Sequence, residues 1–268
     1  MKDFRAAFLE KYPNNAYVLN RMVEYDGEPE WEKFTRPWLS GMTRYFKEVM
    51  SDSSARVALS YIKAVLNEYS ELVKLPTNKF AEALSVRDTR AVETWLTEDE
   101  LSMLKCTNES ERPILYDFLL GAFTGARQSD YLKFDDKNIV KGRVDYNAVK
   151  TGTRVLVPIK PIVKRIINHP RANVSNQYFN TVIKVICRNS GINEEIKLFR
   201  AGKEVVGEKW RFISSHTARR SFATNLYLRG VDIVSIGRMM GHSSIEMTKR
   251  YIVSGMRDLS EDEMEFFK

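Results

Sequence analysis

The chain has 268 residues, of which 43% are hydrophobic, enough to bury the cores of two modest domains. Its 42 Lys and Arg outnumber its 35 Asp and Glu, and the net charge of +7 favours a polyanionic partner. The sequence has neither a secretory signal nor the roughly 18 to 20 apolar residues that a membrane helix needs, so we expect a soluble, cytoplasmic protein.

The positive charge is concentrated after the first third of the sequence. Residues 1–96 contain 14 Lys and Arg and 14 Asp and Glu, whereas residues 97–256 contain 26 and 16. Residues 257–268 form an acidic tail with apolar positions that suit a short helix. We therefore expect a surface that binds a polyanion to lie between residues 97 and 256.

Residues 1–85 have the pattern of a small helical domain. We expect one helix from about Trp31 to Met50, with a buried face formed by Trp38, Tyr45, Phe46 and Val49. A second helix is expected to begin at Ser53 or Ser54 and to end before Pro76. Its apolar positions are Val57, Tyr61, Val65, Tyr69 and Leu72.

A polar stretch, residues 86–96, is interpreted as the linker between two domains. Thr97 and Glu100 follow it with the spacing of a capping box, in which each side chain accepts a hydrogen bond from the other residue's backbone N–H. This pattern predicts that a helix begins there. We expect a second domain, residues 97–268, to begin with this helix.

Residues 119–134 (LLGAFTGARQSDYLKF) predict an apolar helix that ends at a turn formed by Thr124 and Gly125. Arg127 follows this turn, and Asp130 comes three residues later. Residues at this spacing are neighbours on a helix, so the two side chains could also form a simple ion pair.

A β-hairpin is predicted next, with strands from Asn138 to Tyr146 and from Arg154 to Ile159. The connection, AVKTGT, places Lys150 at the edge of the hairpin, from which an ammonium group could reach a polyanionic partner. Lys141 in the same hairpin and Lys160 just beyond it could fill this role in place of Lys150.

Residues 160–190 predict two helices, and residues 196–213 predict a second, basic hairpin. The first helix would bury Val163, Ile166 and Ile167, and the second Phe179, Val182, Ile183 and Ile186. The hairpin carries Lys197, Arg200, Lys203, Lys209 and Arg211. These side chains suit contacts with a DNA backbone or a solvated charged surface, and the sequence leaves both open.

Residues 216–251 (HTARRSFATNLYLRGVDIVSIGRMMGHSSIEMTKRY) predict three short helices. The first runs from about His216 to Arg229 and ends at Gly230, a residue suited to a left-handed cap. Because residues three apart share a helical face, His216 and Arg219 could bind the same phosphate. Arg220 lies one step round the helix and is expected to point elsewhere.

The second helix would end at Gly241 and leave His242 in a turn. Ser243 and Glu246 have the spacing of a capping box, which predicts a third helix with Tyr251 two turns in. This short helix would tether Tyr251 near His242.

In order and spacing, these motifs resemble tyrosine recombinases, the phage integrase family. The resemblance rests on HTARRSFATNL, on GHSS, on a tyrosine nine residues after His242, and on Arg127 in a Thr-Gly-x-Arg context. It implies a mainly α fold with small β-hairpins, in which a SAM-like helical core-binding domain (residues 1–85) precedes an α+β catalytic domain (residues 97–268).

The resemblance also implies roles for single residues. The catalytic set is Arg127, Lys150, His216, Arg219, His242 and Tyr251, with Asp130 supporting Arg127. Tyr251 would attack a DNA phosphate and form a 3′-phosphotyrosyl bond, with His216 as general base and Lys150 as general acid. His242 would donate a hydrogen bond to a non-bridging oxygen or align the nucleophile. No cofactor and no metal ion are implied.

The implied function is that of a site-specific DNA recombinase or integrase from a phage or another mobile element. Its partners would be double-stranded DNA at specific recombination sites and further protomers, assembled as a tetramer. The tail, residues 257–268, could pack against a neighbouring protomer or its own domain. The alternatives are a type IB topoisomerase-like enzyme that relaxes DNA and a non-catalytic DNA-binding relative. The presence of all six catalytic side chains argues against the second.

Each residue of this set has an ordinary structural use when taken singly. His216 could cap its helix, Tyr251 could fill a core, and His242 could close a turn. The family order of all six residues is what favours the catalytic interpretation.

Overall fold

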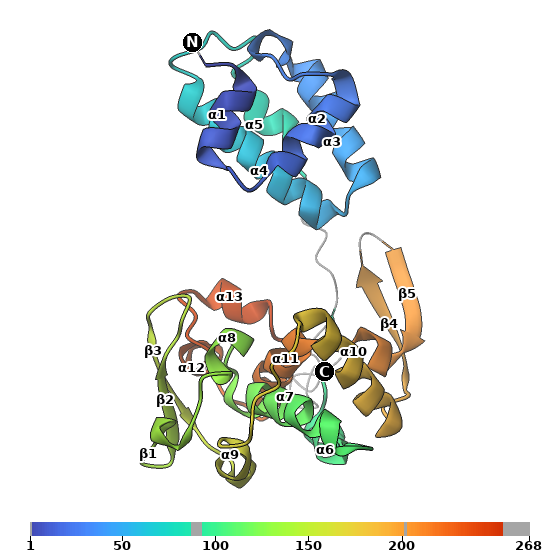
Figure 1. The fold of residues 1–268 in the computed structure, drawn as a ribbon, viewed down its shortest axis with the longest axis vertical. Helices are drawn as coiled ribbons and strands as arrows, with labels where there is room; N and C mark the ends of the chain where they lie inside the picture. The colour runs from blue at the N-terminus through green and yellow to red at the C-terminus, as the bar shows by residue number, and fades with distance from the viewer. Residues whose placement is uncertain (1, 87–92, 201–202, 254–268) are drawn as a thin grey trace, which may run out of the picture. The chain divides into compact units, whose positions relative to one another are not determined.

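The computed structural model describes residues 2–86, 93–200 and 203–253, which form mainly helices and two small sheets (Figure 1). The chain divides into two compact units. The N-terminal unit is built around Met1–Ala91, and the C-terminal unit around Val92–Phe199 and Glu204–Lys268. This composition confirms the predicted mainly α fold with small β-hairpins. The predicted tail, residues 257–268, lies outside the described residues.

The N-terminal unit is a set of short helices around an aromatic core. Its elements are α1 (Phe4–Lys11), α2 (Ala16–Asp26), η1 (Trp31–Lys33), α3 (Arg36–Val49), α4 (Asp52–Tyr69) and α5 (Phe80–Ala83). Buried side chains from these elements form one cluster that includes Phe4, Phe8, Met22, Phe34, Leu39 and Phe46. The burial of these large side chains supplies most of the stabilisation of a unit of this size.

The predicted helix from Trp31 to Met50 is wrong in its start and partly wrong in its buried face. Helix α3 begins after Thr35, whose side chain accepts a hydrogen bond from the backbone N–H of Trp38. The buried residues of α3 are Leu39, Met42, Thr43 and Phe46, so only Phe46 belongs to the predicted set. Trp38 and Tyr45 are half-buried and pack against the core cluster, whereas Val49 is exposed.

The prediction for α4 is wrong at its cap and in part of its buried face, although Val65 is buried and Tyr61 and Tyr69 pack against the core. The cap is Ser51, and the buried positions are Ala55, Ala58, Leu59, Ile62, Val65 and Leu66. Val57 is 43% exposed and Leu72 is 69% exposed. A strict four-residue step advances about 400° on a helix, so the predicted set drifts by about 40° per step away from the core.

The C-terminal unit packs its helices around a central pair (Figure 1). Its first half contains α6 (Glu98–Met103), η2 (Glu109–Glu111), α7 (Arg112–Thr124), α8 (Gln128–Tyr131), η3 (Asp136–Asn138), β1 (Ile139–Val140), β2 (Arg143–Asn147) and β3 (Arg154–Pro158). Its second half contains α9 (Pro161–Ile166), α10 (Asn176–Asn189), β4 (Glu195–Arg200), β5 (Lys203–Glu208), η4 (Lys209–Phe212), α11 (Ser215–Leu228), α12 (Ile233–Met239) and α13 (Ile245–Lys249). The predicted helices after Lys160 and the second hairpin are confirmed.

Helices α7 and α11 form the central pair of this unit. Gly121 of α7 permits their close approach, because a Cβ atom there would lie 2.9 Å from the Tyr131 ring and 3.1 Å from the Ala218 Cβ. Helix α7 ends at Gly125, which has a positive φ of 65° and confirms the predicted turn. The end of α7 and the start of α11 are thereby held together.

The predicted first hairpin is a three-stranded antiparallel sheet in the order β1-β2-β3. The expected first strand is broken at Lys141 and Gly142, which have positive φ angles of 48° and 74° and form a tight turn. Asn147 pairs with Arg154 at one end of β2, and Arg143 pairs with Pro158 at the other. Lys141 and Lys150 therefore lie at opposite ends of β2.

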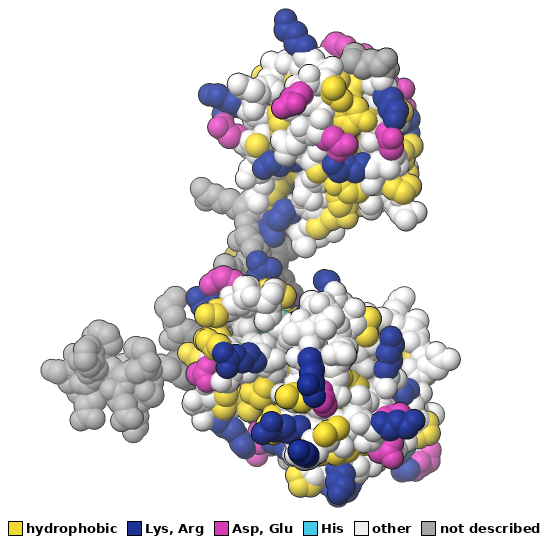
Figure 2. Space-filling model, turned by 90° about the vertical axis from the view of Figure 1, so that its left-hand side faces the viewer, with side chains coloured by type: hydrophobic (Ala, Val, Ile, Leu, Met, Phe, Trp, Pro, Cys, Tyr) yellow, Lys and Arg dark blue, Asp and Glu magenta, His cyan; other side chains and the backbone are white. Residues whose placement is uncertain are grey.

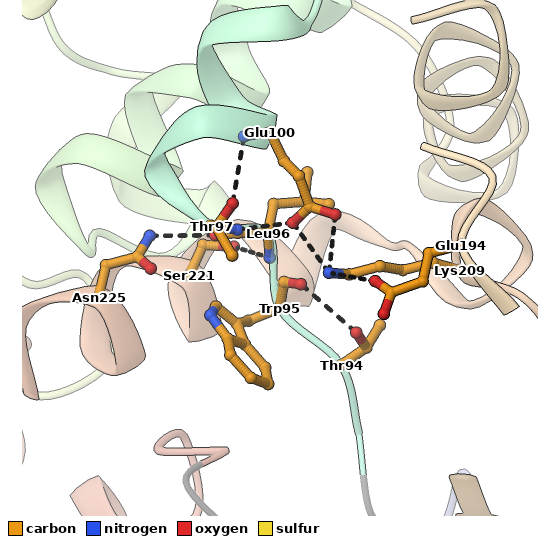
Figure 3. Close-up of polar contacts among 9 residues, drawn as sticks. All are labelled: Thr94, Trp95, Leu96, Thr97, Glu100, Glu194, Lys209, Ser221 and Asn225. Atoms are coloured by element: carbon orange, nitrogen blue, oxygen red, sulfur yellow. Dashed lines mark hydrogen bonds and ion pairs between the residues drawn. The ribbon is translucent and has the colours of Figure 1, made fainter. Parts of the chain in front are cut away.

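The segment that enters the C-terminal unit is fastened to α11 (Figure 3). The backbone N–H of Leu96 donates to Ser221 Oγ at 2.9 Å, and Asn225 Nδ2 donates to the Leu96 carbonyl at 3.0 Å. Thr97 and Glu100 form the predicted capping box. Thr94 and Leu96, which were expected in the linker, are buried.

Lys209 fits neither of the two uses left open for the second hairpin, contact with a DNA backbone or a solvated charged surface. Its side chain is buried and lies 2.7 Å from a Glu100 carboxylate oxygen, as Figure 3 shows. Because η4 turns this ammonium group inward, it cannot reach a DNA backbone. Within the described ranges, no helix is long and apolar enough to cross a lipid bilayer.

Candidate active site

The six predicted catalytic side chains all belong to the C-terminal unit. Arg127 precedes α8, Lys150 lies between β2 and β3, His216 and Arg219 lie at the start of α11, His242 follows α12, and Tyr251 follows α13. A cleft of about 300 Å³ is lined by Arg127, Lys150, His216, Arg219 and Tyr251, together with Ala126, Gln128, Ser129, Asn176 and Ser215. The fold therefore gathers five of the six residues in one cleft from segments far apart in the sequence.

Arg219 is the most enclosed cation of this cleft, with 3% of its surface exposed. Its Nη2 donates to the Met240 carbonyl at 2.6 Å and to His242 Nε2 at 2.8 Å, and its Nη1 donates to the Gly125 carbonyl. Burial and the nearby Arg127 lower the pKa of Arg219. Three protein acceptors therefore hold the guanidinium in a fixed orientation.

Two arginine donors in the cleft lack an acceptor. Arg219 Nε and Arg127 Nη1 are both buried, and neither finds a hydrogen-bond partner among the described residues. Buried N–H groups without partners are rare in folded proteins, and those of a guanidinium are matched geometrically by carboxylate or phosphate oxygens. The arrangement suits an anion that binds both arginines.

His242 links Arg219 to the segment that carries Tyr251. A guanidinium group only donates, so His242 Nε2 accepts from Arg219, and the ring proton on Nδ1 is donated to Thr248 Oγ1 at 3.0 Å. Burial and the charges of Arg219 and Arg127 lower the pKa of His242 to about 4. The imidazole is therefore neutral near pH 7, with both nitrogens engaged within the protein.

His216 is also neutral near pH 7, for similar reasons. Burial lowers its pKa, and the positive charges of Arg220 and Arg219 lower it further. Unlike His242, it lines the cleft. A neutral imidazole in this position can accept a proton from a group bound in the cleft.

Tyr251 lies just beyond α13, not two turns inside it as predicted. The cap of α13 is Ser244, whose side chain accepts from the Met247 N–H, so Ser243 and Glu246 do not form the expected capping box. The helix then ends at Lys249. The cap sits one residue later than predicted and the helix is only five residues long, which leaves Tyr251 in the following turn.

The Tyr251 ring packs against three of the cationic or titratable groups around it. The guanidinium carbons of Arg219 and Arg220 lie 5.2 Å and 6.0 Å from the ring centroid, and the His242 ring lies 5.3 Å away. The expectation that Arg220 points elsewhere is therefore wrong, because both arginines reach this ring. Arg220 also lies 3.8 Å from Glu93.

Asp130 braces the cleft through backbone groups. Its buried carboxylate accepts hydrogen bonds from the N–H of Val149 at 2.8 Å and the N–H of Arg127 at 3.3 Å. The carboxylate thereby ties the Arg127 loop to the turn that carries Lys150. Of the three lysines considered, only Lys150 lines the cleft, since Lys141 lies at the far end of β2 and Lys160 pairs with Glu98.

Sequence reasoning missed several polar residues that shape the cleft. Ser215 Oγ donates to Asn176 Oδ1 at 3.2 Å, and the two residues line the cleft together. Ser215 adjoins His216 in sequence, but no local signal marks Asn176, which lies on α10 and is 39 residues from Ser215. No local sequence signal identified Thr248 either, the residue that accepts a hydrogen bond from His242. In the part of the chain that the structure describes, no group of three or more His, Cys, Asp or Glu residues could hold a metal ion.

Comparisons with known proteins show the family to which the chain belongs. Residues 94–257 match the phage integrase family. The integrase of Escherichia phage 186 is 26% identical over 210 residues, which cover 76% of this chain and 57% of that protein. Tyrosine recombinase XerA of Pyrococcus furiosus is 25% identical over 237 residues, which cover 86% of this chain and 82% of that protein. The chain spans little more than half the length of the phage integrases it matches.

Solved structures with the same fold include two integrases in complex with DNA. A lambda integrase (75–356) dimer bound to a COC′ core site aligns with a TM-score of 0.66 and 18% identity, covering 94% of this chain and 91% of that one. The Tn1549 transposon integrase in complex with a circular intermediate DNA aligns with a TM-score of 0.67 and 16% identity, covering 99% and 100%. At these identities, the likeness establishes the fold.

Proposed function

The chain belongs to the phage integrase family, and on this premise we propose that it is a site-specific DNA recombinase that acts through a covalent bond to Tyr251. The observation that carries the proposal is the pair of buried arginine donors without acceptors in a cleft that Tyr251 also lines. A DNA phosphate would satisfy both donors. The same phosphate would lie within reach of the tyrosine.

The two arginines would stabilise the transition state of phosphoryl transfer. Negative charge builds up on the non-bridging oxygens as phosphorus becomes five-coordinate, so fixed cations at those oxygens lower the barrier. Arg127 Nη1 and Arg219 Nε are free to bind these oxygens, while carbonyls and His242 hold the rest of the Arg219 guanidinium in place. His242 acts by orientation, because its Nε2 accepts from Arg219.

The covalent step transfers the phosphate from a DNA oxygen to Tyr251. The Tyr251 phenolic oxygen forms a bond to phosphorus, and the bond from phosphorus to the 5′ oxygen of the next nucleotide breaks. His216 takes the phenolic proton, and Lys150 gives a proton to the leaving 5′ oxygen. The products are a 3′-phosphotyrosyl bond and a free 5′-hydroxyl. A second 5′-hydroxyl can reverse the step without ATP, because the phosphodiester energy is kept.

The proposed partners are double-stranded DNA and further copies of this chain. Lys and Arg side chains are spread over the face of the C-terminal unit seen in Figure 2. The related lambda integrase has been solved as a dimer bound to a core site and as a tetramer bound to a Holliday junction. We propose a corresponding tetramer on paired sites, with the N-terminal unit as the core-binding domain and the cytoplasm as the location.

The proposal is tested by trapping the covalent intermediate. The full-length protein is incubated in EDTA with a library of nicked DNA duplexes of random sequence, and DNA that stays attached to denatured protein is sequenced. The wild type should yield adducts at the 3′ phosphate. Tyr251→Phe should bind DNA normally but yield none, whereas Tyr227→Phe, at an exposed position on α11, should match the wild type.

Other outcomes separate the alternative functions. A wild-type level of adduct from Tyr251→Phe would remove the proposed nucleophile. Efficient relaxation of plasmids by single protomers, without preference for a sequence, would indicate a type IB topoisomerase. Tight DNA binding by the wild type without any adduct would indicate a non-catalytic relative.

A further inference from the structure

Thr224 holds the backbone that follows the proposed nucleophile. It lies on α11, is fully buried, and uses one hydroxyl group for two hydrogen bonds. The hydroxyl donates to the Tyr251 carbonyl at 3.2 Å and accepts from the Val253 N–H at 3.1 Å. A hydroxyl has a single proton to donate, so the donor capacity of Thr224 is spent on the Tyr251 segment.

The Thr224 hydroxyl does not form the hydrogen bond that a threonine in a helix usually forms. In a helix interior, a threonine hydroxyl commonly donates to the carbonyl four residues earlier in its own helix. Ser221 in the same helix does so, donating to the Thr217 carbonyl at 2.9 Å. Thr224 instead donates to a segment 27 residues away in the sequence. The hydrogen bond therefore serves the tertiary structure.

The Tyr251 segment has few other restraints from its own helix. Helix α13 has only five residues and ends before Tyr251. On the N-terminal side, the Tyr251 N–H donates to the Thr248 carbonyl at 2.9 Å. On the C-terminal side, the Thr224 hydroxyl holds both the carbonyl of Tyr251 and the N–H of Val253.

We propose that Thr224 is the positioning residue for the nucleophile, a role that rests on the proposed function of Tyr251. His216 and Arg219 project from the same helix as Thr224, so one rigid element would set the distance between the nucleophile and the groups that activate it. An in-line attack requires the reacting atoms to be roughly 3 to 3.5 Å apart, and a misplacement of about 1 Å can slow a reaction about 100-fold.

The experiment compares Thr224→Val with Thr224→Ser in the full-length protein. Valine keeps the shape of threonine but cannot form either hydrogen bond, whereas serine keeps the hydroxyl and loses only a methyl group. The substrate is a nicked duplex that carries the cleavage sequence trapped with the wild type. Adduct formation is followed in single-turnover reactions with excess protein, and DNA affinity is measured separately.

We expect Thr224→Val to form adduct about 10- to 100-fold more slowly, with DNA affinity within about threefold of the wild type. Thr224→Ser should form adduct within a few-fold of the wild-type rate. A substrate with sulfur in place of the leaving 5′ oxygen should not restore the rate of adduct formation by Thr224→Val. A better leaving group does not correct the position of the nucleophile. Should Thr224→Val fail to fold, Thr224→Cys, with a weakly bonding thiol, replaces it.

Three results would overturn the inference. These are a wild-type rate in Thr224→Val, an equal loss of rate in Thr224→Ser, or a loss of rate matched by an equal loss of DNA affinity. If the wild type itself forms no adduct, the proposed function fails and this inference fails with it. If the wild type forms adduct and Thr224→Val equals it, only the positioning role is lost.

Discussion

At the scale of single residues, the cleft combines buried cations with neutral bases. Arg219 is held by two carbonyls and by His242, and burial together with the neighbouring arginine charges lowers the pKa of both histidines. A neutral His216 is what a proton acceptor near pH 7 requires. The structure therefore supports separate proposed tasks for the two imidazoles, with His242 as an orienting group and His216 as a base.

The role of Lys150 is tested by changing the leaving group. In Lys150→Ala, cleavage of an ordinary phosphodiester should fall about 100- to 1000-fold, because the leaving 5′ oxygen loses its proton donor. A substrate with sulfur at that position should be cleaved at close to the wild-type rate, since a thiolate leaves without protonation. Single-turnover adduct formation on the two substrates measures the effect.

Lys141→Ala is the matched control for this prediction. It removes the same ammonium group from the opposite end of β2, outside the cleft, and should cleave both substrates normally. If Lys141→Ala is slow on the oxygen substrate and is rescued by sulfur, Lys141 is the acid and the assignment of Lys150 is wrong.

His242 makes stability depend on pH. Its pKa is about 4 in the folded protein and about 6.5 in the unfolded chain, so the unfolded chain binds more protons between these values. The stabilisation is fully present above pH 6.5 and is lost as the pH falls toward 4. Between pH 7 and pH 5 we expect a loss on the order of 1 kcal/mol, after allowance for partial exposure.

The measurement is the free energy of urea unfolding at pH 7 and at pH 5, for the wild type and for His242→Asn. Asparagine can still accept from Arg219 and donate to Thr248, but it does not titrate. The variant should lose less stability than the wild type between the two pH values. An equal loss in both proteins would show that His242 does not titrate with the lowered pKa.

At the scale of elements, the sequence predicted that the helices and hairpins exist, but only some of their boundaries and buried faces. The capping box of α6 and the glycine end of α7 follow from residues within one turn of each other, and both are confirmed. The buried faces of α3 and α4 were partly wrong, because the choice of face depends on which neighbouring helices pack there. The presence and approximate position of a helix thus follow from the local sequence, whereas the side of the helix that faces the core depends on its neighbours.

The residues of the candidate site also fall into those that the sequence predicted and those that it did not. Its six proposed catalytic residues were predicted because the family's motifs fix their order and spacing in the sequence. Thr224, Asn176 and the inward turn of Lys209 were not predicted, because each depends on a contact with a distant segment. The broken strand at Lys141 was missed because a residue with a Cβ seldom adopts a positive φ.

At the scale of the whole molecule, the distribution of charge bears on where DNA lies. Residues 97–256 carry 26 Lys and Arg against 16 Asp and Glu, so affinity for DNA should fall steeply with salt. Three of the five cationic side chains of the second hairpin are in ion pairs: Lys197 with Glu204, Arg211 with Glu208, and Lys209 with Glu100. The ion pairs favour the solvated-surface interpretation of this hairpin.

Two substitutions with the same charge change test this placement in the full-length protein. Binding to a DNA duplex of random sequence is measured between 50 and 200 mM salt, and the logarithm of the association constant is plotted against that of the salt concentration. Lys150→Gln, in the cleft, should make the slope shallower by about 0.9, the value for one lost phosphate contact. Lys197→Gln, on the hairpin, should change the slope less, because this ammonium group lies outside the cleft and 3.6 Å from a Glu204 carboxylate oxygen. If Lys197→Gln flattens the slope as much as Lys150→Gln does, the hairpin lies on the DNA backbone and its charges are part of the interface.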